Sequence, residues 1–455
     1  MDADDRIVGR GPHLTDPIHA WHTLVRENAN PDLCGSLAAR MQERRLTFGG
    51  RLLCPFLRPF FLDPRDEARV KDAAEMLWRL GERVANVAAG DALLLEHLGL
   101  NDDEIRLAQI DPGYDIASTA GRADAFILPD SLQFAEYNAE SPAGPGYSQR
   151  LSELFDEEPL MDRFKQRFDV RYYTPITALL EALLQSYAQW GGIERSPRIA
   201  IVDWSEVPTW SEFELLRDAF TSAGIPTVVA DPRDLVFDRA RGLFAEGERI
   251  DLVYRRVLIN DIVARPDECR ALIDAYTAHA VCVANTLRCK IAHKKSFFAV
   301  LTDERYASLF TASEREMIAA HIPWTRIVQA DRADDIRRRR DCLVLKPNDE
   351  YGGTGVTLGW ETSERAWDDA IGRALRESDE VERPWIVQER INVRREIFPV
   401  CESTGVFERE MLVDFAPYLF RGRMAGFLTR LSATGLANVT SGGGQVPAFI
   451  VQSRD

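Results

Sequence analysis

A lysine followed by a glycine-rich stretch is the first pattern in the sequence that could do chemistry. The apolar run CLVLKP brings Lys346 to its end, and NDEYGGTGV follows directly. Glycines let backbone N–H groups approach phosphate oxygens closely, and lysine adds a positive charge beside them. The spacing differs from the GxxxxGK[ST] of a Walker P-loop. A phosphate-binding turn with Gly352 and Gly353 fits these residues, and so does a plain hairpin with a surface lysine.

A second pattern combines an arginine, two carboxylates and an amide. Arg122 and Asp124 lie two apart at the start of one short apolar run, and the tripeptide EYN ends the next run. A Pro-Asp-Ser turn separates the two runs, which predicts paired strands. Residues two apart share a strand face, so Glu136 and Asn138 would lie side by side and close to Asp124. Such oxygens are the ligands that Mg²⁺ prefers, although an exposed strand face fits equally.

Two further segments carry weaker patterns. WIVQERI predicts a buried strand with a polar end, whose residues Gln388-Glu389-Arg390-Ile391 can offer backbone groups to an adenine edge. Glu389 could also reach a ribose or a metal. In HKKSFFAVL, Lys295 stands at the start of an amphipathic helix. Taken alone, the first segment fits a solvated sheet edge, and the second fits a solvated helix start.

The elements that must position these residues follow from the spacing of apolar side chains. Residues 67–98 and 174–190 have helical spacing. After a composition break at 191–197, RIAIVDW, SEFELLRDAFTSAG and IPTVVADP alternate strand, helix and strand. This alternation predicts a small, mostly parallel sheet, and the absence of GxGxxG gives no support for a dinucleotide site there. From about residue 285, a helix over AHKKSFFAVLTDE and strands at CLVLKP, WIVQERI and the C-terminal end predict a strand-rich α+β region.

Composition narrows the class of protein. The 455 residues exceed one ordinary domain, and the formal net charge of −16 argues against a general nucleic-acid binder. No apolar run is long enough for a membrane helix, and the acidic, polar start does not resemble a secretory signal, so we expect a cytoplasmic protein with no membrane partner. The seven cysteines are scattered and form no CxxC pair, which predicts reduced, packed thiols and no disulfide framework or zinc site.

The order of the motifs resembles that of the circularly permuted ATP-grasp proteins, the group that includes glutathionylspermidine synthetase. The likeness spans roughly residues 120–432. It comprises R-x-D, E-x-N followed by Ser-Pro-Ala-Gly, a helix-opening lysine, VLKP with its glycine loop, VQE, and AGF-x-x-R. In other ATP-grasp chains the metal ligands lie near the C-terminal end. Here they precede the parallel-sheet region, which is the mark of permutation.

The resemblance implies a mixed α+β and α/β fold, a circularly permuted ATP-grasp fold with a Rossmann-like pre-ATP-grasp middle domain. The expected domains are a helical region and core segment with the metal ligands (1–192), the Rossmann-like domain (193–285), and the lid with the nucleotide-binding core (286–455). The implied cofactors are ATP and Mg²⁺. Asp124, Glu136 and Asn138 would bind magnesium, and Arg122 would act as the catalytic residue that stabilises charge on the transferring groups. The implied ATP-binding residues are Lys295, Lys346, Gly352, Gly353, Gln388, Glu389, Arg390, Ile391 and Arg430.

The activity that the resemblance implies is ATP- and Mg²⁺-dependent carboxylate–amine ligation through an acylphosphate, with small-molecule or peptide substrates. One departure affects the substrates. After E-x-N the chain reads AESPAGPGY, where thiol-tripeptide ligases are richer in Asp, Thr and Ser, so glutathione and spermidine do not follow. Two alternatives stay open: an ATP-dependent phosphotransferase and a non-catalytic ATP-binding protein. The Gly-rich tail, with Asn438 and Gly442–Gly444, would border the acceptor site or form a structural turn.

Overall fold

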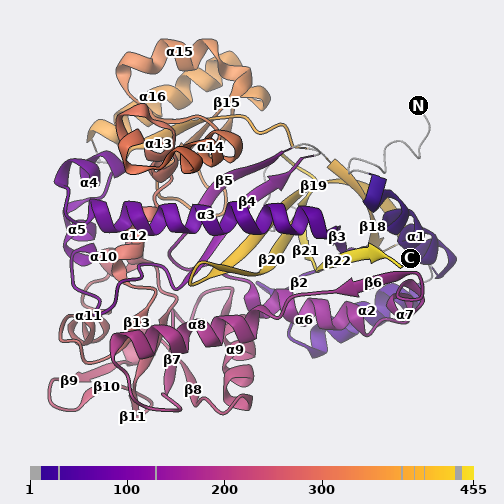
Figure 1. Cartoon of the computed structure of the whole chain (residues 1–455), viewed down its shortest axis with the longest axis horizontal. Helices are drawn as coiled ribbons and strands as arrows, with labels where there is room; N and C mark the ends of the chain where they lie inside the picture. Colours follow the sequence, from indigo (N-terminus) through magenta and orange to yellow (C-terminus); the bar gives the residue numbers. More distant parts are fainter. Residues whose placement is uncertain are drawn as a thin grey trace.

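A computed structural model of the chain describes residues 12–28, 31–128, 131–380, 383–393, 395–403, 405–435 and 443–454. Figure 1 shows three levels: a small lid at the top, a central sheet crossed by one long helix, and a parallel sheet at the bottom. The predicted domain boundaries at 192/193 and 285/286 stay predictions. Asn438 and Gly442, named above for the acceptor side, lie outside the described residues.

The central sheet brings together two distant parts of the chain. Its strands run in the order β21-β20-β19-β4-β5, with β18 also paired to β19, and every pairing is antiparallel. The strands are β4 (Ala120–Ile127), β5 (Leu132–Asn138), β18 (Arg395–Glu402), β19 (Gly405–Phe420), β20 (Arg423–Ser432) and β21 (Gly444–Val446). The predicted pairing of the two short runs is therefore confirmed. The C-terminal region holds more strand than predicted, because the long β19 interrupts its apolar pattern with an exposed, charged stretch at 408–410.

The long helix α3 (Pro64–Ala88) crosses the central sheet (Figure 1). It starts cleanly because Asp63 accepts hydrogen bonds from the N–H groups of Arg65 and Asp66, and Pro64 occupies the first turn. Apolar residues at helical spacing, from Val70 to Val84, are buried. The single helical stretch predicted over 67–98 is wrong in one respect. The chain breaks at residues 89–91, and Asp91 caps a new helix, α4 (Ala92–Leu98).

The bottom level is the predicted parallel sheet, which the structure confirms. Its order is β13-β12-β7-β8, formed by β7 (Ile199–Val202), β8 (Thr227–Ala230), β12 (Leu252–Arg255) and β13 (Cys282–Ala284). Strands buried on both faces need uninterrupted apolar runs, which is what IAIV provides. Helices α9 (Trp210–Ser222), α10 (Ile259–Ala264) and α11 (Arg270–Thr277) accompany it, and β9 (Val236–Asp238), β10 (Gly242–Ala245) and β11 (Glu248–Ile250) form a separate antiparallel sheet.

The lid is a four-stranded antiparallel sheet in the order β14-β17-β15-β16. Its elements are β14 (Thr325–Ile327), β15 (Leu343–Pro347), β16 (Thr357–Leu358) and β17 (Trp385–Glu389), with α15 (Ala333–Arg338) and α16 (Glu364–Glu380). The buried residues Ile336, Leu343, Trp367 and Ile371 belong to a hydrophobic cluster of the lid alone. A unit with its own core can shift relative to the central sheet without exposing that core.

The segment that carries Lys295 is broken, whereas one continuous helix is predicted from its sequence. Helix α12 (Lys290–His293) ends where Lys294 adopts an extended conformation, and α13 (Ser296–Thr302) starts anew. Asn348 of the lid holds the break open. Its backbone carbonyl accepts from the N–H of Lys295, and its side-chain oxygen accepts from the N–H of Ser296. The break is thus imposed by a tertiary contact, which helical periodicity does not report.

The remaining helices and strands include a small mixed sheet. This sheet, of order β3-β22-β6, joins the N-terminal helices to the end of the chain, and α8 confirms the helix predicted over 174–190. These elements are α1 (Pro12–Asn28), α2 (Pro31–Glu43), β1 (Thr47–Phe48), β2 (Arg51–Leu52), β3 (Phe60–Leu62), α5 (Asp102–Ala108), α6 (Pro145–Asp156), α7 (Pro159–Phe164), β6 (Phe168–Arg171), α8 (Pro175–Trp190), α14 (Ala312–His321) and β22 (Ala448–Ser453). Among the helices of the described ranges, none has the length and apolarity to cross a bilayer.

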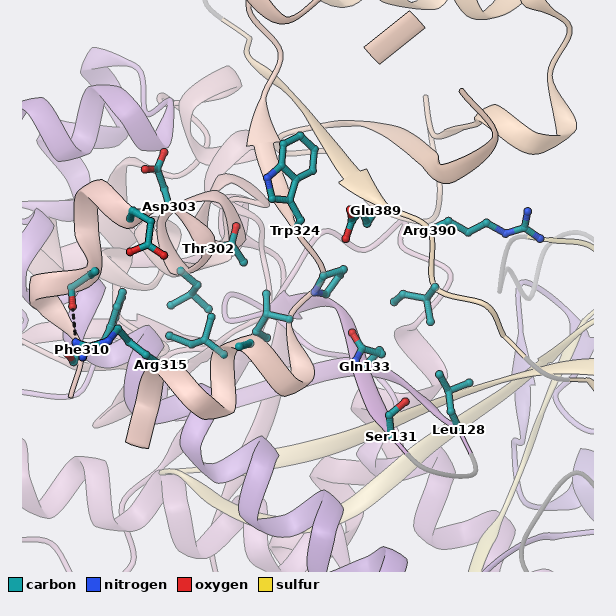
Figure 2. Close-up of a pocket in the computed structure, with 18 of the residues that line it drawn as sticks. Leu128, Ser131, Gln133, Thr302, Asp303, Phe310, Arg315, Trp324, Glu389 and Arg390 are labelled. Atoms are coloured by element: carbon teal, nitrogen blue, oxygen red, sulfur yellow. Dashed lines mark hydrogen bonds between the residues drawn. The ribbon is translucent and has the colours of Figure 1, made fainter. Parts of the chain in front are cut away.

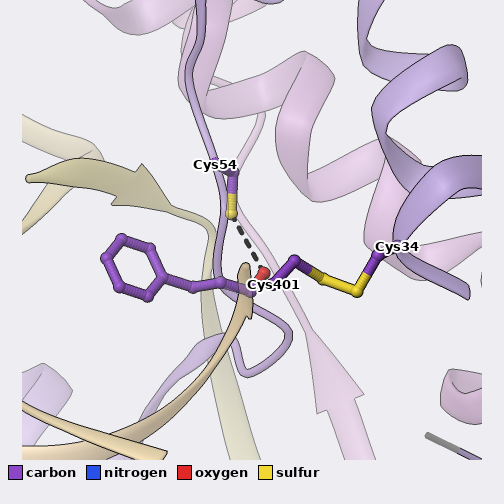
Figure 3. The surroundings of a disulfide bond; sticks show 4 residues. Cys34, Cys54 and Cys401 are labelled. Atoms are coloured by element: carbon purple, nitrogen blue, oxygen red, sulfur yellow. Dashed lines mark hydrogen bonds between the residues drawn. A yellow bond between two sulfur atoms is a disulfide. The ribbon is translucent and has the colours of Figure 1, made fainter. Parts of the chain in front are cut away.

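A disulfide bond corrects the prediction that the cysteines are all reduced thiols. Cys34 of α2 and Cys401 of β18 are bonded, with their Cα atoms 5.8 Å apart (Figure 3). The two residues are separated by 367 positions, so no local spacing could have revealed the pair. The other five cysteines are free, and only Cys342 among them is exposed. Cys54, which Figure 3 shows beside the disulfide, donates to the carbonyl of Phe56.

Candidate active site

Two lysines from different elements point into one space between the lid and the central sheet. Lys346 lies near the end of β15, and its Nζ donates to Gln388 Oε1 at 2.7 Å and to the carbonyl of Ala135 at 3.1 Å. Lys295 lies at the helix break, with its Nζ 3.6 Å from Glu136 Oε2. Side chains from near residue 130 and from near residue 346 therefore meet, as the resemblance requires.

The charge on Lys346 is poorly compensated. Burial lowers the pKa of its ammonium to about 8, against the opposing effect of Glu136 and with a further lowering by the nearby charge of Lys295. It donates hydrogen bonds to two neutral oxygens, those of Ala135 and Gln388. A buried cation whose hydrogen-bond partners are neutral loses hydration and gains only the more distant charges of Glu136 and Asp124 in return. A phosphate group in this space would supply a closer counter-charge.

Two carboxylates and an amide lie on the central sheet, facing the lysines. Asp124 and Glu136 are directly opposite each other on β4 and β5. The side-chain Nδ2 of Asn138 donates to Asp124 Oδ1 at 3.2 Å and to Glu136 Oε1 at 3.0 Å. The predicted closeness of the three side chains is confirmed, while their role stays a prediction.

These three side chains fit a magnesium ion. Within the described part of the chain, no three His, Cys, Asp or Glu side chains form a metal-binding group, but the predicted set uses an amide as its third member. Rotating the Asn138 amide by half a turn would present its oxygen beside the two carboxylates. Carboxylate and amide oxygens are hard ligands, and Mg²⁺ commonly takes its remaining ligands from water and phosphate. Asp124, Glu136 and Asn138 would therefore hold the ion against the phosphates.

Two arginines flank Asp124. Arg122 donates from Nε to Asp124 Oδ1 at 2.9 Å and from Nη1 to the carbonyl of Ala143. Arg430 bonds Asp124 Oδ2 from the other side through Nη2. Burial alone would raise the pKa of Asp124, but the charges of Arg122 and Arg430 outweigh burial and hold the pKa well below its usual range. Asp124 thus stays ionised, which a metal ligand must be.

Asp414 is a site residue that the sequence patterns did not single out. It lies on β19, and Arg430 donates to its Oδ2 as well as to Asp124. Its other oxygen, Oδ1, is buried and has no hydrogen-bond partner among the described residues. Burial, opposed by Arg430, raises the pKa of this carboxyl to about 7. The sequence did contain a signal for this residue, the lone aspartate in the apolar run MLVDFAPYLF. Burying a carboxylate costs free energy, so its presence in an apolar strand indicates a functional or ion-pairing position.

A cavity of about 160 Å³ lies between these groups. The predicted site residues that line it are Asp124, Glu136, Lys295, Lys346, Gly352, Gly353, Gln388, Glu389, Ile391 and Arg430. Arg122 and Asn138 do not line it, although both contact Asp124. Ligand pockets for drug-sized molecules usually measure about 300–1,000 Å³, so a nucleotide would need more space than this cavity offers, and an outward movement of the lid would provide it.

The glycine loop after β15 has a backbone conformation that requires glycine. Gly352 and Gly353 have φ values of 64° and 78°, in the left-handed region that side chains other than glycine rarely adopt. A Cβ at Gly352 would meet nothing within 4 Å, so only the backbone conformation demands glycine there. The two glycines thus place no side chain between their backbone and the cavity, which suits the close approach of a phosphate.

The segment Gln388–Ile391 serves more than one purpose. Gln388 accepts from Lys346 and donates to Thr325 Oγ1, so its side chain orients the lysine. The carboxylate of Glu389 accepts from Arg339 at 2.7 Å. The backbone N–H groups of residues 389 and 390 are already bonded within the lid, to the carbonyls of Trp324 and Cys342. An adenine ring bound at this segment would therefore contact its carbonyl groups and residue 391.

A second cavity, of about 580 Å³, adjoins the same segment (Figure 2). Trp324, Glu389 and Gln133 border it, and Arg315 and Asp303 lie at its far side. Of the predicted site residues that the structure describes, only those at 389–391 line it. Arg390 lines this cavity and not the smaller one, with its guanidinium 4.4 Å from the centre of the Trp360 ring. The predicted role of Arg390 in ATP binding stays a prediction.

Comparison with known proteins places this arrangement in a family. The family model for circularly permuted ATP-grasp type 2 matches residues 127–432, which is more than half of the chain. The chain therefore belongs to the circularly permuted ATP-grasp type 2 family. This membership confirms the predicted fold and the predicted enzyme class, a ligase that forms C–N bonds. No curated protein matches the sequence.

Solved structures agree on the fold. A glutathione synthetase-like effector from Globodera pallida in its apo form is similar over 92% of this chain and 98% of its own, with a TM-score of 0.60 and 13% identity. A candidate gamma-glutamylcysteine synthetase from Methylobacillus flagellatus KT matches over 76% of this chain and 84% of its own, with 11% identity. Its TM-score of 0.39 is too low to support an argument. At 13% identity, the first likeness speaks for the fold alone.

Proposed function

We propose that the protein is an ATP- and Mg²⁺-dependent carboxylate–amine ligase that works through an acylphosphate, with small-molecule or peptide substrates. One observation supports this most: Lys295 and Lys346 converge with Asp124 and Glu136 on a single cavity beneath a glycine loop. Cations for phosphates and hard oxygen ligands for magnesium belong together at a site that transfers a phosphoryl group. The formal net charge of −16 fits small substrates and gives no support for nucleic acid.

The chemistry requires activation, because a carboxylate oxygen is a poor leaving group. The substrate carboxylate attacks the γ-phosphorus of ATP, an O–P bond forms, and the bond to the leaving ADP oxygen breaks. The amine then attacks the acyl carbon, the C–N bond forms, the C–O bond to phosphate breaks, and the amine nitrogen loses a proton. The products are an amide, ADP and inorganic phosphate.

The residues of the chain would contribute charge and position. Lys346 and Lys295 would bind the phosphates, and Arg122 and Arg430, held by Asp124, would offset charge that builds up during transfer. Magnesium, bound by the carboxylates and the amide, would neutralise phosphate oxygens. The glycine loop would close over the phosphates and exclude water, which would otherwise hydrolyse an acylphosphate.

The decisive experiment is a screen for ADP release with amino acids, polyamines and peptides as amines and a matching panel of carboxylates, with mass detection of the condensed product. Amine-dependent ADP release with a product of the expected mass supports the ligase. ADP release and a phosphorylated product without any amine would point to a phosphotransferase. Mg²⁺-dependent ATP binding without turnover would point to a non-catalytic protein.

A cytoplasmic location is part of the proposal, and the Cys34–Cys401 disulfide makes it worth testing, because such bonds are rare in that compartment.

A further inference from the structure

A larger cavity lies on the other side of the glycine loop from the cavity of about 160 Å³. We call the smaller one, where we place ATP, the nucleotide cavity. The larger cavity measures about 810 Å³, and the glycine loop forms the wall between the two. Gly352 and Gly353 face the smaller cavity, whereas Tyr351 and Gly355 face the larger one. Glu350 lines both. A molecule in the larger cavity would therefore lie next to the phosphates once the loop moves.

The larger cavity is also where the three levels of the fold meet. Its walls come from the α4–α5 connection, from α10 of the bottom level, and from β15, the glycine loop and α16 of the lid (Figure 1). The bottom level contributes residues 258–264 to this cavity, whereas the described residues of 193–285 contribute none to the nucleotide cavity. A space between bodies that can shift relative to one another is a common place for a substrate.

One wall of the larger cavity is a buried charge network. Lys294 is 4% exposed, and its Nζ bonds both oxygens of Glu104 at 2.8 Å and Asp349 Oδ2 at 2.6 Å. Lys290 bonds the other oxygen of Asp349 at 2.8 Å and Glu140 Oε2 at 3.3 Å. The charges in this wall satisfy one another. They hold Asp349, at the start of the glycine loop, in place. Because these charges are already paired, they offer few partners to a charged ligand.

One further acidic residue of the cavity, Glu377 on α16, accepts a hydrogen bond from Trp385 Nε1 at 2.7 Å. Four other charged residues of the cavity have neither an ion pair nor a side-chain hydrogen bond among the described residues. Two are acidic, Asp261 on α10 and Glu350 on the loop. Two are basic, Arg373 on α16 and Arg383 between α16 and β17. The acidic groups without such a partner thus come from the bottom level and the loop, and the guanidinium groups come from the lid. A molecule with an ammonium at one end and a carboxylate at the other would match both sets.

We infer that the larger cavity binds the amine substrate, and that this substrate is an amino acid or a short peptide with a free carboxylate. The inference rests on the proposed ligase function. Glu350 faces both cavities, so it draws the ammonium toward the phosphates, while Arg373 and Arg383 hold the carboxylate. A polyamine would leave both guanidinium groups without a partner.

Binding tests the inference without requiring turnover. Saturation-transfer NMR in the presence of Mg²⁺ and a non-hydrolysable ATP analogue would compare the twenty amino acids and simple dipeptides with their carboxamides and with putrescine and spermidine. At least one amine with a free carboxylate is expected to bind, and its carboxamide and the polyamines are not. The double variant Arg373→Gln/Arg383→Gln should weaken that binding about tenfold or more, the scale of a charge-assisted hydrogen bond. Arg376→Gln, an exposed arginine of α16 that does not line the cavity, is the matched control.

The outcomes separate this inference from the proposed function. Preference for a polyamine, binding that the double arginine variant leaves unchanged, or no binding by any panel member with a free carboxylate would overturn the inference. In those cases the affinity for a fluorescent ATP analogue, measured with Mg²⁺, would still depend on Lys346 and Glu136. If Lys346→Ala and Glu136→Gln leave that affinity unchanged, the proposed function itself fails, whatever the larger cavity binds.

Discussion

The ammonium group of Lys346 donates a hydrogen bond to the backbone carbonyl of Ala135, 3.1 Å away and 211 positions distant in the sequence. This contact joins the lid strand β15 to the core strand β5, one residue from Glu136. It places Lys346, the proposed phosphate-binding cation, beside the proposed metal ligands, at a cavity that residues of both strands line.

Replacing Lys346 by alanine should abolish most ATP turnover. The expected loss is roughly 10²- to 10³-fold in kcat, the scale for removing one preorganised electrostatic donor. Lys71→Ala is the control, because Lys71 is about half exposed on α3 and forms an i,i+4 ion pair with Glu75 of the same helix. ADP release measures activity, and circular dichroism verifies the fold. Equal activity in the two variants would remove Lys346 from the mechanism.

Replacing Glu136 by glutamine should raise the Mg²⁺ concentration needed for half-maximal activity. We expect an increase on the order of 10- to 100-fold, the range seen when groups around a metal ligand are changed. Glu248→Gln, an exposed glutamate of the bottom level, is the control. A Mg²⁺ titration of ADP release at saturating ATP gives the answer. An unchanged Mg²⁺ requirement in Glu136→Gln would place the ion elsewhere.

The affinity for ATP should fall as pH rises through about 8. Burial lowers the pKa of Lys346 to about 8, so the ammonium is charged below that pH and neutral above it. The quantity to follow is kcat/KM for ATP, which reports the free enzyme. In Lys346→Arg the guanidinium stays charged, so the fall should vanish or move to higher pH. A profile that falls at the same pH in both proteins would assign the titration to another group.

The lowered pKa of Lys346 also makes the stability of the protein depend on pH. The folded pKa of Lys346 lies below its unfolded value, so the unfolded chain binds more protons between about pH 8 and pH 10. The contribution of this residue to the free energy of unfolding therefore rises with pH across that window. Urea unfolding of wild type and Lys346→Ala at pH 7.5 and pH 9.5 measures it. Parallel changes in both proteins would contradict this assignment.

Replacing Asp349 by asparagine should destabilise the protein. The change leaves Lys290 and Lys294 with one fewer counter-charge in a buried network. Breaking a buried pair from one side typically costs about 3–5 kcal/mol. Asp341→Asn is the control, because Asp341 is exposed and pairs only with its neighbour Arg340. The urea midpoint should drop in Asp349→Asn alone, and equal midpoints would show that the network adds nothing.

Thiol titration should distinguish the disulfide from the reduced state. The chain has seven cysteines, of which five are free in the structure. Denatured, unreduced protein should therefore react with five equivalents of a thiol reagent, and peptide mapping should find Cys34 joined to Cys401. Seven equivalents would restore the prediction of reduced thiols. The variant Cys34→Ser should expose one additional free thiol, that of Cys401.

The sequence predicted those parts of the site that lie close together along the chain. The β4–β5 hairpin carries its own alternation and turn, so the proximity of Asp124, Glu136 and Asn138 followed from strand geometry. The parallel sheet followed from uninterrupted apolar runs. Bringing Lys346 to this hairpin required the family resemblance, because nothing local connects residues 211 positions apart.

The features that escaped prediction depend on long-range contacts. Asp414 lines the nucleotide cavity because β19 lies beside β4. A single polar residue in an apolar strand does not reveal which strand will be its neighbour. The helix break at Lys294 and Lys295 is set by Asn348 from the lid. The Cys34–Cys401 bond links residues 367 positions apart. None of these has a period or spacing in the sequence.

The central claim is that one Mg·ATP lies between β15 and the β4–β5 hairpin. A crystal structure of the protein with Mg²⁺ and a non-hydrolysable ATP analogue tests it most directly. The account predicts the terminal phosphates against the ammonium groups of Lys295 and Lys346, with the ion on Asp124 and Glu136. A nucleotide bound elsewhere, for example in the cavity beside Trp324, with these four side chains unengaged, would contradict it.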